Sequence, residues 1–437
     1  MYDEIRKQVD EMLVMNLKKI KLQLAPGGKG KKGKKGKKGK DKKKKPLPGD
    51  KISELKGMDT DQMLAVLIEN QLVVRCRDRK ISGLIGDFNY LGTVHHNSDR
   101  KGEGSWEPSD PSIAQIRQSI TEYCILPNGS PEVKALMNPL IKSVCLYGPA
   151  GSGKTHAVEA VANELGALLI HLSPDKLRGQ FGGKTGPTKL VHMVMKVAMD
   201  PTMQPAVIYI DECEQFFTGG KKNKDKDGPS RFKKDFLTYK NQALGPEHRV
   251  IVIGNTRLPE NGDIKDMRGF FDKFLYMPYP DYSSRLMIWQ HHIENRFKEG
   301  LRRLDPTLLE MPKNAQQSAE RDNLIRTKIR LAMAKINVSS LAQISEGYSA
   351  GAVARTVRAV ISNRRMAMLK QRPLVSVDFL DNLSIQEVTY HDDCIAFNTF
   401  TKVITGLDDR RKKIEALVSG EGDGADAKKG GKDAKKK

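Results

Sequence analysis

Residues Ser143–Thr155, SVCLYGPAGSGKT, are the most informative segment of this 437-residue chain about its fold. Its apolar start predicts a short strand, and its second part, Gly148-Pro149-Ala150-Gly151-Ser152-Gly153-Lys154-Thr155, fits the pattern G-x-x-x-x-G-K-[ST]. Glycines at these places let the backbone wrap a phosphate chain and point its N–H groups at it. We expect Lys154 to reach the β- and γ-phosphates of ATP, Thr155 to bind Mg²⁺, and His156 to complete the nucleotide site.

Two carboxylates follow a second apolar run. Ala206–Ile210, AVIYI, predicts a buried strand that ends in Asp211 and Glu212. Beside a phosphate loop, Asp211 is expected to support Mg²⁺ and Glu212 to polarise the attacking water, since phosphoryl transfer needs positioning and charge stabilisation. After a further strand, Asn255 or Thr256 could contact the γ-phosphate or the water, although a plain turn at a strand end explains these two residues as well.

Strands and helices alternate from residue 110, which is typical of a parallel α/β sheet. From about Tyr282 the pattern becomes mostly helical. We therefore predict a P-loop α/β fold with a helical lid and basic tails. The predicted parts are an amphipathic helix (1–25), a disordered lysine-rich linker (26–50), an N-terminal linker segment (51–109), an α/β nucleotide-binding domain (110–280), a helical lid (281–390) and a C-terminal extension with a basic tail (391–437).

The net charge of +22 is concentrated in two segments. Lys29–Lys45 holds twelve lysines and one aspartate, and Lys428–Lys437 six lysines and one aspartate, so the rest of the chain carries only +6. No aromatic residues interleave the lysines to stack on bases, so nucleic acid is not an expected partner, and acidic tubulin tails suit these segments better. No apolar run reaches the roughly 20 residues of a membrane span, so no membrane partner is expected.

The ordered motifs LYGPAGSGKT, VIYIDE, GNTRLP and GYSAG (347–351) resemble those of AAA ATPases over residues 110–390. The resemblance implies an α/β nucleotide domain with a helical lid, assembly into rings, and an ATP site at each subunit interface. AAA proteins supply arginine fingers to the neighbouring site. Here Arg268 can stand for one finger, whereas Phe270 occupies the place of the second.

Other places depart from the AAA pattern. The pore loop, usually aromatic-hydrophobic-glycine, reads Gln180-Phe181-Gly182-Gly183 and matches in part. Thr256 stands where the sensing asparagine is common, and Asn255 comes one place earlier. In the lid, Ala352 replaces an acidic residue, and Arg355 could contact phosphate instead. The resemblance therefore implies an intact nucleotide pocket, whereas the residues that would couple it to neighbouring subunits depart from the AAA pattern.

A closer resemblance covers nearly the whole chain. A Gly-Lys-Lys tract, IGDFNYLG (85–92), LSPDKLRGQFGGKTGPTKLVHMV (172–194) and MPYPDYSSRLMIWQHHIEN (277–295) look like the IQ-and-AAA-domain proteins, AAA subunits of the dynein regulatory complex in motile cilia. This resemblance implies a place in the nexin link of the axoneme, with the other subunits and doublet-microtubule tubulin as partners. No I-Q-x-x-x-R-G motif occurs, so any calmodulin-binding region is expected upstream or is missing.

Three functions are compatible with these patterns. An axonemal scaffold subunit that binds ATP, with slow or regulated hydrolysis, fits the eroded ring features. An active ring-forming motor, such as a microtubule-severing enzyme, fits the intact Lys154, Asp211 and Glu212. A nucleic-acid-binding protein would have to bind its ligand through the lysine-rich segments alone.

Overall fold

Five parallel strands form the sheet that carries the predicted site. They are β1 (Ser143–Tyr147), β2 (Leu168–Leu172), β3 (Ala206–Ile210), β4 (Val250–Thr256) and β5 (Lys273–Tyr276). Their order across the sheet is β2-β3-β4-β1-β5, and every neighbouring pair is parallel. β1, β3 and β4 are buried along their whole length, as expected for strands covered by helices on both faces. The predicted fold class is confirmed.

The computed structural model describes residues 46–88, 110–218, 227–304, 315–369 and 371–407, together with 409, 410 and 412. The predicted helix at 1–25, both lysine-rich segments and most of the stretch 218–230 lie outside these ranges. No helix within them is long and apolar enough to cross a membrane.

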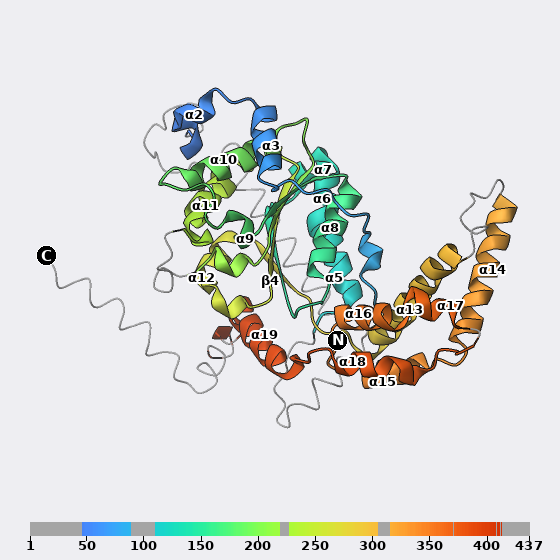
Figure 1. Ribbon diagram of the computed structural model, residues 1–437. Helices are drawn as coiled ribbons and strands as arrows, with labels where there is room; N and C mark the ends of the chain where they lie inside the picture. The colour runs from blue at the N-terminus through green and yellow to red at the C-terminus, as the bar shows by residue number, and fades with distance from the viewer. Residues whose placement is uncertain are drawn as a thin grey trace, which may run out of the picture. The chain divides into compact units, whose positions relative to one another are not determined.

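Helices cover both faces of the sheet (Figure 1). One face carries α5 (Ile113–Ile120), α6 (Leu126–Gly129), α7 (Pro131–Leu136) and α8 (Lys154–Leu165). The other carries α9 (Pro174–Leu177), α10 (Gly186–Met199), α11 (Lys233–Gln242) and α12 (Ile264–Phe270). Side chains of β1 alternate between them: Val144 and Leu146 join the α8 side, Cys145 and Tyr147 the α10 side. Short 3₁₀ helices lie at Pro48–Lys51, Ile81–Gly83, Cys213–Gln215, Pro229–Phe232, Pro259–Asn261 and Ser376–Phe379, and a π-helical turn lies at Thr121–Ile125.

The segment before the nucleotide domain belongs to the same core. It contains α2 (Ser53–Lys56) and α3 (Thr60–Glu69), which packs against α10. Leu67 and Leu72 are fully buried in the cluster that also holds the strand side chains. Val73 then forms an antiparallel bridge to Ile170 of β2. What the sequence suggested as a linker therefore covers the exposed edge of the sheet, which would otherwise leave unpaired backbone groups.

The lid has a core of its own, built by α13 (Tyr282–Leu304), α14 (Ala315–Met333), α15 (Val338–Ile344), α16 (Ala350–Val360), α17 (Asn363–Ala367) and α18 (Leu380–Ser384). At its centre the buried Trp289 donates to Ser345 Oγ at 2.9 Å. The last helix, α19 (Tyr390–Thr405), returns to the α/β domain (Figure 1). There Phe397 and Phe400 are buried with Tyr147 of β1.

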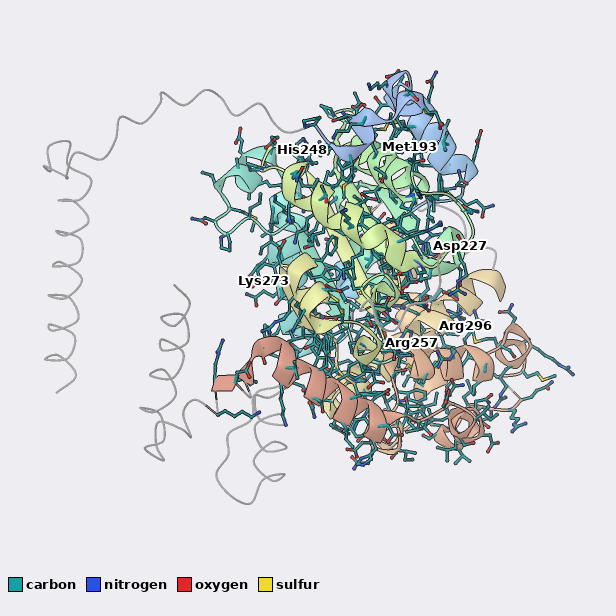
Figure 2. All side chains as sticks on the ribbon, turned by 90° about the vertical axis from the view of Figure 1, so that its left-hand side faces the viewer. Met193, Asp227, His248, Arg257, Lys273 and Arg296 are labelled. Atoms are coloured by element: carbon teal, nitrogen blue, oxygen red, sulfur yellow. The ribbon has the colours of Figure 1, made fainter. Side chains whose placement is uncertain are left out.

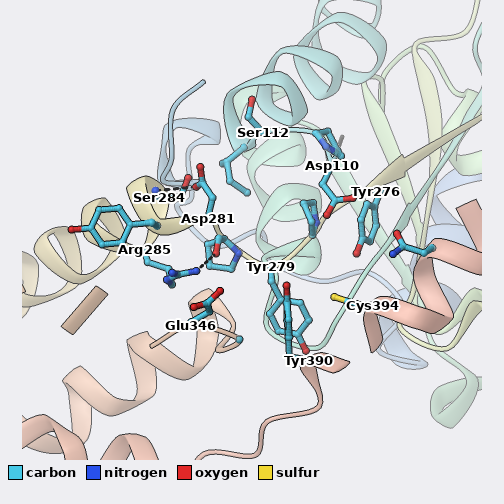
Figure 3. Close-up of a pocket in the computed structure, with 17 residues that line it drawn as sticks. Asp110, Ser112, Tyr276, Tyr279, Asp281, Ser284, Arg285, Glu346, Tyr390 and Cys394 are labelled. Atoms are coloured by element: carbon cyan, nitrogen blue, oxygen red, sulfur yellow. Dashed lines mark hydrogen bonds between the residues drawn. The ribbon is translucent and has the colours of Figure 1, made fainter. Parts of the chain in front are cut away.

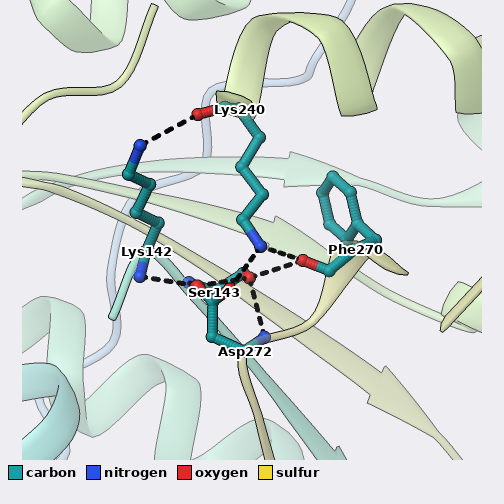
Figure 4. Close-up of polar contacts among 5 residues, drawn as sticks. All are labelled: Lys142, Ser143, Lys240, Phe270 and Asp272. Atoms are coloured by element: carbon teal, nitrogen blue, oxygen red, sulfur yellow. Dashed lines mark hydrogen bonds and ion pairs between the residues drawn. The ribbon is translucent and has the colours of Figure 1, made fainter. Parts of the chain in front are cut away.

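One carboxylate fixes the start of β1 to the chain before β5 (Figure 4). Asp272 Oδ2 accepts from the backbone N–H groups of Lys142 at 2.8 Å and Ser143 at 3.0 Å, and from Ser143 Oγ at 3.1 Å. Lys240 Nζ donates to Asp272 Oδ1 at 2.7 Å and also to the Phe270 carbonyl oxygen. Burial lowers the pKa of Lys240, and Asp272 counteracts that shift. The network holds the strand that leads into the phosphate loop.

We expect Asp272→Ala to lower the free energy of unfolding by about 2–3 kcal/mol, because it leaves Lys240 buried without its counter-charge and the backbone N–H groups of Lys142 and Ser143 without their acceptor. Urea denaturation of the purified chain measures this loss. Glu260→Ala, which removes an exposed carboxylate, serves as the control. Equal stabilities of the two variants would contradict the structural role of the network.

Candidate functional site

The phosphate loop joins the end of β1 to the N-terminus of α8. Gly148, Gly151 and Gly153 have φ angles of 151°, 79° and 101°, a backbone conformation that side chains with a Cβ rarely adopt. Gly148 also has no room for a side chain, because a Cβ there would lie 2.2 Å from the Met277 carbonyl oxygen. The predicted strand–loop–helix context is therefore present, with loop backbone and a helix N-terminus at one place.

Lys154 is folded into this loop. Its Nζ donates to the carbonyl oxygens of Gly148 and Pro149, both at 2.7 Å, and lies 3.4 Å from Ser152 Oγ. The residue is only 7% exposed, and burial lowers the pKa of its amine to about 8. All three acceptors are neutral, so a phosphate at this place would supply the counter-charge that the buried ammonium lacks.

Asp211 and Glu212 lie at the carboxyl end of β3, beside the loop. Asn255, at the end of β4, donates from Nδ2 to Asp211 Oδ1 at 3.2 Å and to the Tyr209 hydroxyl at 3.0 Å. Burial acts to raise the pKa of Asp211, but interactions with His171 and Tyr209 outweigh it and hold the pKa below the usual carboxyl value. Asp211 is thus kept ionised, as a metal ligand must be.

Glu212 has a strained backbone. Its φ of 45° is left-handed, a conformation that costs energy for a residue with a side chain and occurs most often at functional sites. The side-chain Oε2 accepts from Gln215 Nε2 at 2.5 Å. The hydrogen bond from Gln215 holds the carboxylate of Glu212, a residue that lines the same cavity as Lys154 and Asp211.

These groups share a cavity of about 440 Å³. The predicted residues that line it are Ala150, Gly151, Gly153, Lys154, Thr155, His156, Asp211, Glu212, Asn255 and Thr256. Arg79, Arg257 and Gly351 line it too, and none of these was singled out from the sequence as a site residue. The volume lies within the usual range of small-molecule pockets, roughly 300–1,000 Å³.

Residues 79–86, here called the strap, cover α8 next to the loop. Arg79 Nε pairs with Glu159 Oε2 at 2.7 Å, and its Nη1 lies 3.0 Å from Nδ1 of His156. A Cβ on Gly153 would lie 2.9 Å from Leu84 of the strap, so the glycine permits this contact. Burial lowers the pKa of His156. No periodic pattern in the sequence pointed to the strap as a wall of the site.

The lid reaches the phosphate loop through the start of α16. The Gly351 N–H donates to the Gly151 carbonyl oxygen at 2.9 Å, and a Cβ on Gly151 would lie 2.6 Å from Ser349 Oγ. Arg355 instead donates from Nε to Gln386 at 2.9 Å and does not line the cavity. The lid therefore contacts the loop by its backbone, and a phosphate contact of Arg355 stays a prediction.

The two positions discussed as arginine fingers have other partners within this chain. Arg268 Nη2 donates to the carbonyl oxygen of Ile404 at 2.9 Å, near the C-terminus of α19. A positive charge is favourable there because it meets the negative end of the helix dipole. Phe270 is fully buried, with its ring 4.8 Å from that of Phe217 and 4.9 Å from that of Phe271. Phe270 is a core residue that cannot reach a neighbouring subunit.

The partial pore loop is held against the domain. Arg231 donates to the carbonyl oxygens of Phe181 at 3.3 Å and Leu177 at 3.2 Å, and also to that of Gln180. A Cβ on Gly186 would lie 1.8 Å from the Phe181 carbonyl oxygen, so this close approach requires glycine. The Phe181 side chain packs against the core. The loop thus lacks the free aromatic side chain with which a pore would grip a polypeptide.

The donor set fits Mg²⁺ bound together with a nucleotide. Among the described residues, no group of three or more His, Cys, Asp or Glu side chains could hold a metal. Mg²⁺, however, is usually bound by one or two carboxylates together with substrate phosphates and water. Thr155 and Asp211 line the same cavity. Asn255, 6% exposed, has an Oδ1 that finds no hydrogen-bond partner in the described part of the chain, which is a place for a bound water or ligand.

A second cavity of about 250 Å³ lies where α5, the chain after β5, the lid and α19 meet (Figure 3). Its wall includes Tyr276, Tyr279 and Tyr390, with Arg285 on the lid side. Tyr279 donates to Asp393 at 2.6 Å, and Arg285 donates to the carbonyl oxygens of Pro280 and Ala342. These polar groups bind one another across the junction of the α/β domain, the lid and α19, and so stabilise that junction.

Comparison with known proteins agrees with this geometry. Residues 144–279 match the ATPase family associated with various cellular activities (AAA). Dynein regulatory complex protein 11 of Mus musculus is 28% identical over 99% of this chain, which spans about half (48%) of that protein's length. Spastin of Ixodes scapularis is 32% identical over 39% of the chain and 26% of its own length.

Among solved structures, the FIGL-1 AAA domain superposes with a TM-score of 0.52 at 20% identity, covering 81% of this chain and 98% of that one. The same domain in complex with ADP gives 0.51 at 18% identity, with 79% and 97% covered. At these identities the likeness shows the fold alone. Residues 144–279 are thus an AAA domain, and the chain is similar to dynein regulatory complex protein 11 over nearly its whole length and to spastins over part of it.

Proposed function

We propose that this chain binds MgATP in the 440 Å³ cavity and works as the ATP-binding AAA subunit of an axonemal dynein regulatory complex, at the nexin link of the cilium. The observation that carries the nucleotide part is Lys154, a buried ammonium with only neutral acceptors among the described residues. The likeness to dynein regulatory complex protein 11 over 99% of the chain supports the axonemal part.

Each residue of the site has a task in this proposal. Lys154 neutralises the phosphates, Thr155 and Asp211 hold Mg²⁺, and Glu212 orients a water molecule. When bound, the metal supplies positive charge to the phosphate oxygens. Asn255 keeps Asp211 in place through the 3.2 Å hydrogen bond and offers its free Oδ1 to the water.

The proposal favours a structural and regulatory part over a motor. Phe270 is sealed in the core, Arg268 is engaged with α19, and Arg231 holds the partial pore loop down. A trans arginine typically contributes about 10³ to 10⁵ in rate, so hydrolysis without one is expected to be slow. The alternative is a ring-forming motor that acts on microtubules, and the likeness to spastins favours it. The intact Lys154, Asp211 and Glu212 fit either function.

The first test concerns nucleotide binding. Lys154→Ala removes the charge partner of the phosphates, and we expect the affinity for MgATP to fall about tenfold to hundredfold or more. Titration with fluorescent ATP measures it, with the exposed Lys265→Ala as control. In parallel, MgATP at about a hundred times its Kd should stabilise the wild type by roughly 2.7 kcal/mol. Equal affinities of wild type and Lys154→Ala would contradict the assignment of this cavity as the nucleotide site.

The second test separates scaffold from motor. We expect slow ATP turnover per chain that does not rise with protein concentration, and a further loss in Glu212→Gln. Arg268→Ala should leave turnover unchanged but lower the free energy of unfolding by about 1 kcal/mol, because it removes the hydrogen bond to Ile404. Steady-state ATPase assays and urea denaturation measure both. Fast, concentration-dependent turnover that collapses in Arg268→Ala would show the motor instead.

The third test concerns the partners. We expect the tagged chain to remain with isolated axonemes and to cross-link to subunits of the regulatory complex. Microtubule co-sedimentation should decrease with rising salt and on deletion of residues 29–45, because screening shortens the reach of exposed charges. A chain that is washed out of axonemes, and sediments independently of salt and of the deletion, would argue against this location. Calmodulin is a proposed partner only through a region upstream of this chain.

A further inference from the structure

One arginine beside the nucleotide cavity has no partner in the described part of the chain. Arg257 directly follows β4 and is labelled in Figure 2. Its side chain is exposed. It lines the 440 Å³ cavity together with Lys154, Asp211 and Glu212. Within the described residues, its guanidinium makes no hydrogen bond and no ion pair, although it carries five N–H donors.

Arg257 shares the cavity wall with Asp211 and Glu212, the two carboxylates that follow β3. Arg257 also lines a smaller neighbouring cavity of about 120 Å³, which it shares with Glu212 and Glu214. The side chain therefore lies on the wall between the two cavities, on the carboxylate side of the phosphate loop. It is also close enough to Lys154 for its charge to lower the pKa of that lysine. A third phosphate between Lys154 and Glu212 would be a shared counter-ion for the positive charges of Lys154 and Arg257.

The other arginines near the site are already engaged. Arg79, the second arginine of the cavity wall, pairs with Glu159 at 2.7 Å. Arg268 donates to Ile404 and Arg355 to Gln386. Only Arg257 keeps a guanidinium free for an anionic ligand while lining the cavity in the described structure.

We propose that Arg257 recognises the γ-phosphate from within the same chain and so makes the site prefer ATP to ADP. The inference rests on the proposed nucleotide binding and deepens it. A guanidinium can donate two parallel hydrogen bonds to phosphate oxygens, which a lysine cannot do. Because Asn255 and Thr256 are buried at the end of β4, the backbone that carries Arg257 is fixed, and its reach into the cavity does not depend on a neighbouring subunit.

The test compares two nucleotides on three variants of the full chain. We measure the Kd of ADP and of a non-hydrolysable triphosphate analogue, each with Mg²⁺, for the wild type, Arg257→Ala and Arg257→Lys. Arg257→Ala should weaken the triphosphate about tenfold to hundredfold and leave ADP unchanged, since a charge-assisted contact to the third phosphate is lost. The affinity of Arg257→Lys for the triphosphate should lie between those of the wild type and Arg257→Ala. Arg364→Ala, an exposed arginine of the lid, is the matched control.

A mixing experiment decides whether the arginine acts within its own chain. Arg257→Ala chains keep Lys154, and Lys154→Ala chains keep Arg257, so mixing them restores triphosphate affinity only if the arginine acts on a neighbour. We expect no restoration. Restoration, or an equal loss for ADP and the triphosphate, or no loss in Arg257→Ala, would overturn the inference. A wild type that binds neither nucleotide would refute the proposed nucleotide binding itself, which keeps the two failures distinct.

Discussion

Three positions of the phosphate loop, Gly148, Gly151 and Gly153, have no space for a side chain, and the packing of the surrounding segments follows from this. Each of these three left-handed glycines touches a different part of the chain: Gly148 the segment after β5, Gly151 the start of the lid, and Gly153 the strap. A Cβ at any of them would collide within 3 Å. The loop that can wrap a phosphate chain is therefore also where strap, sheet and lid meet. A ligand bound in the loop would act directly on the strap and the lid, because a packed contact transmits small displacements.

The segments on either side of the AAA domain act as parts of it. The stretch around α3 covers the β2 edge, and α19 covers the other end beside β1 and α12. Both contribute fully or nearly fully buried side chains to one apolar cluster with the strands. Arg268 takes part in this packing through its hydrogen bond at the end of α19. Without that contact, the side chain could be presented to a neighbouring subunit. The AAA domain is thus packed against chain segments at both ends.

Positive charge is distributed unevenly around the site. Lys154 is buried in the loop, Arg79 belongs to the strap through Glu159, and Arg257 projects without a partner among the described residues. These three cationic groups beside the cavity all belong to this chain. A nucleotide held mainly by them would stabilise the folded domain by mass action, whatever the rate of its hydrolysis.

The sheet and the phosphate loop could be predicted from the amino-acid sequence, because both depend on local patterns. The apolar runs SVCLY and AVIYI predicted the bounds of β1 and β3; the glycine spacing pointed to Lys154 and Thr155, and the end of AVIYI pointed to Asp211. Arg257 comes directly after the pair Asn255-Thr256, yet nothing local distinguishes an unpaired arginine from one engaged elsewhere. The position of the strap over α8, the burial of Phe270 and the contact of Arg268 with α19 became known only from the tertiary structure. Each of these depends on segments far apart in the chain, and periodicity within one segment carries no information about such contacts.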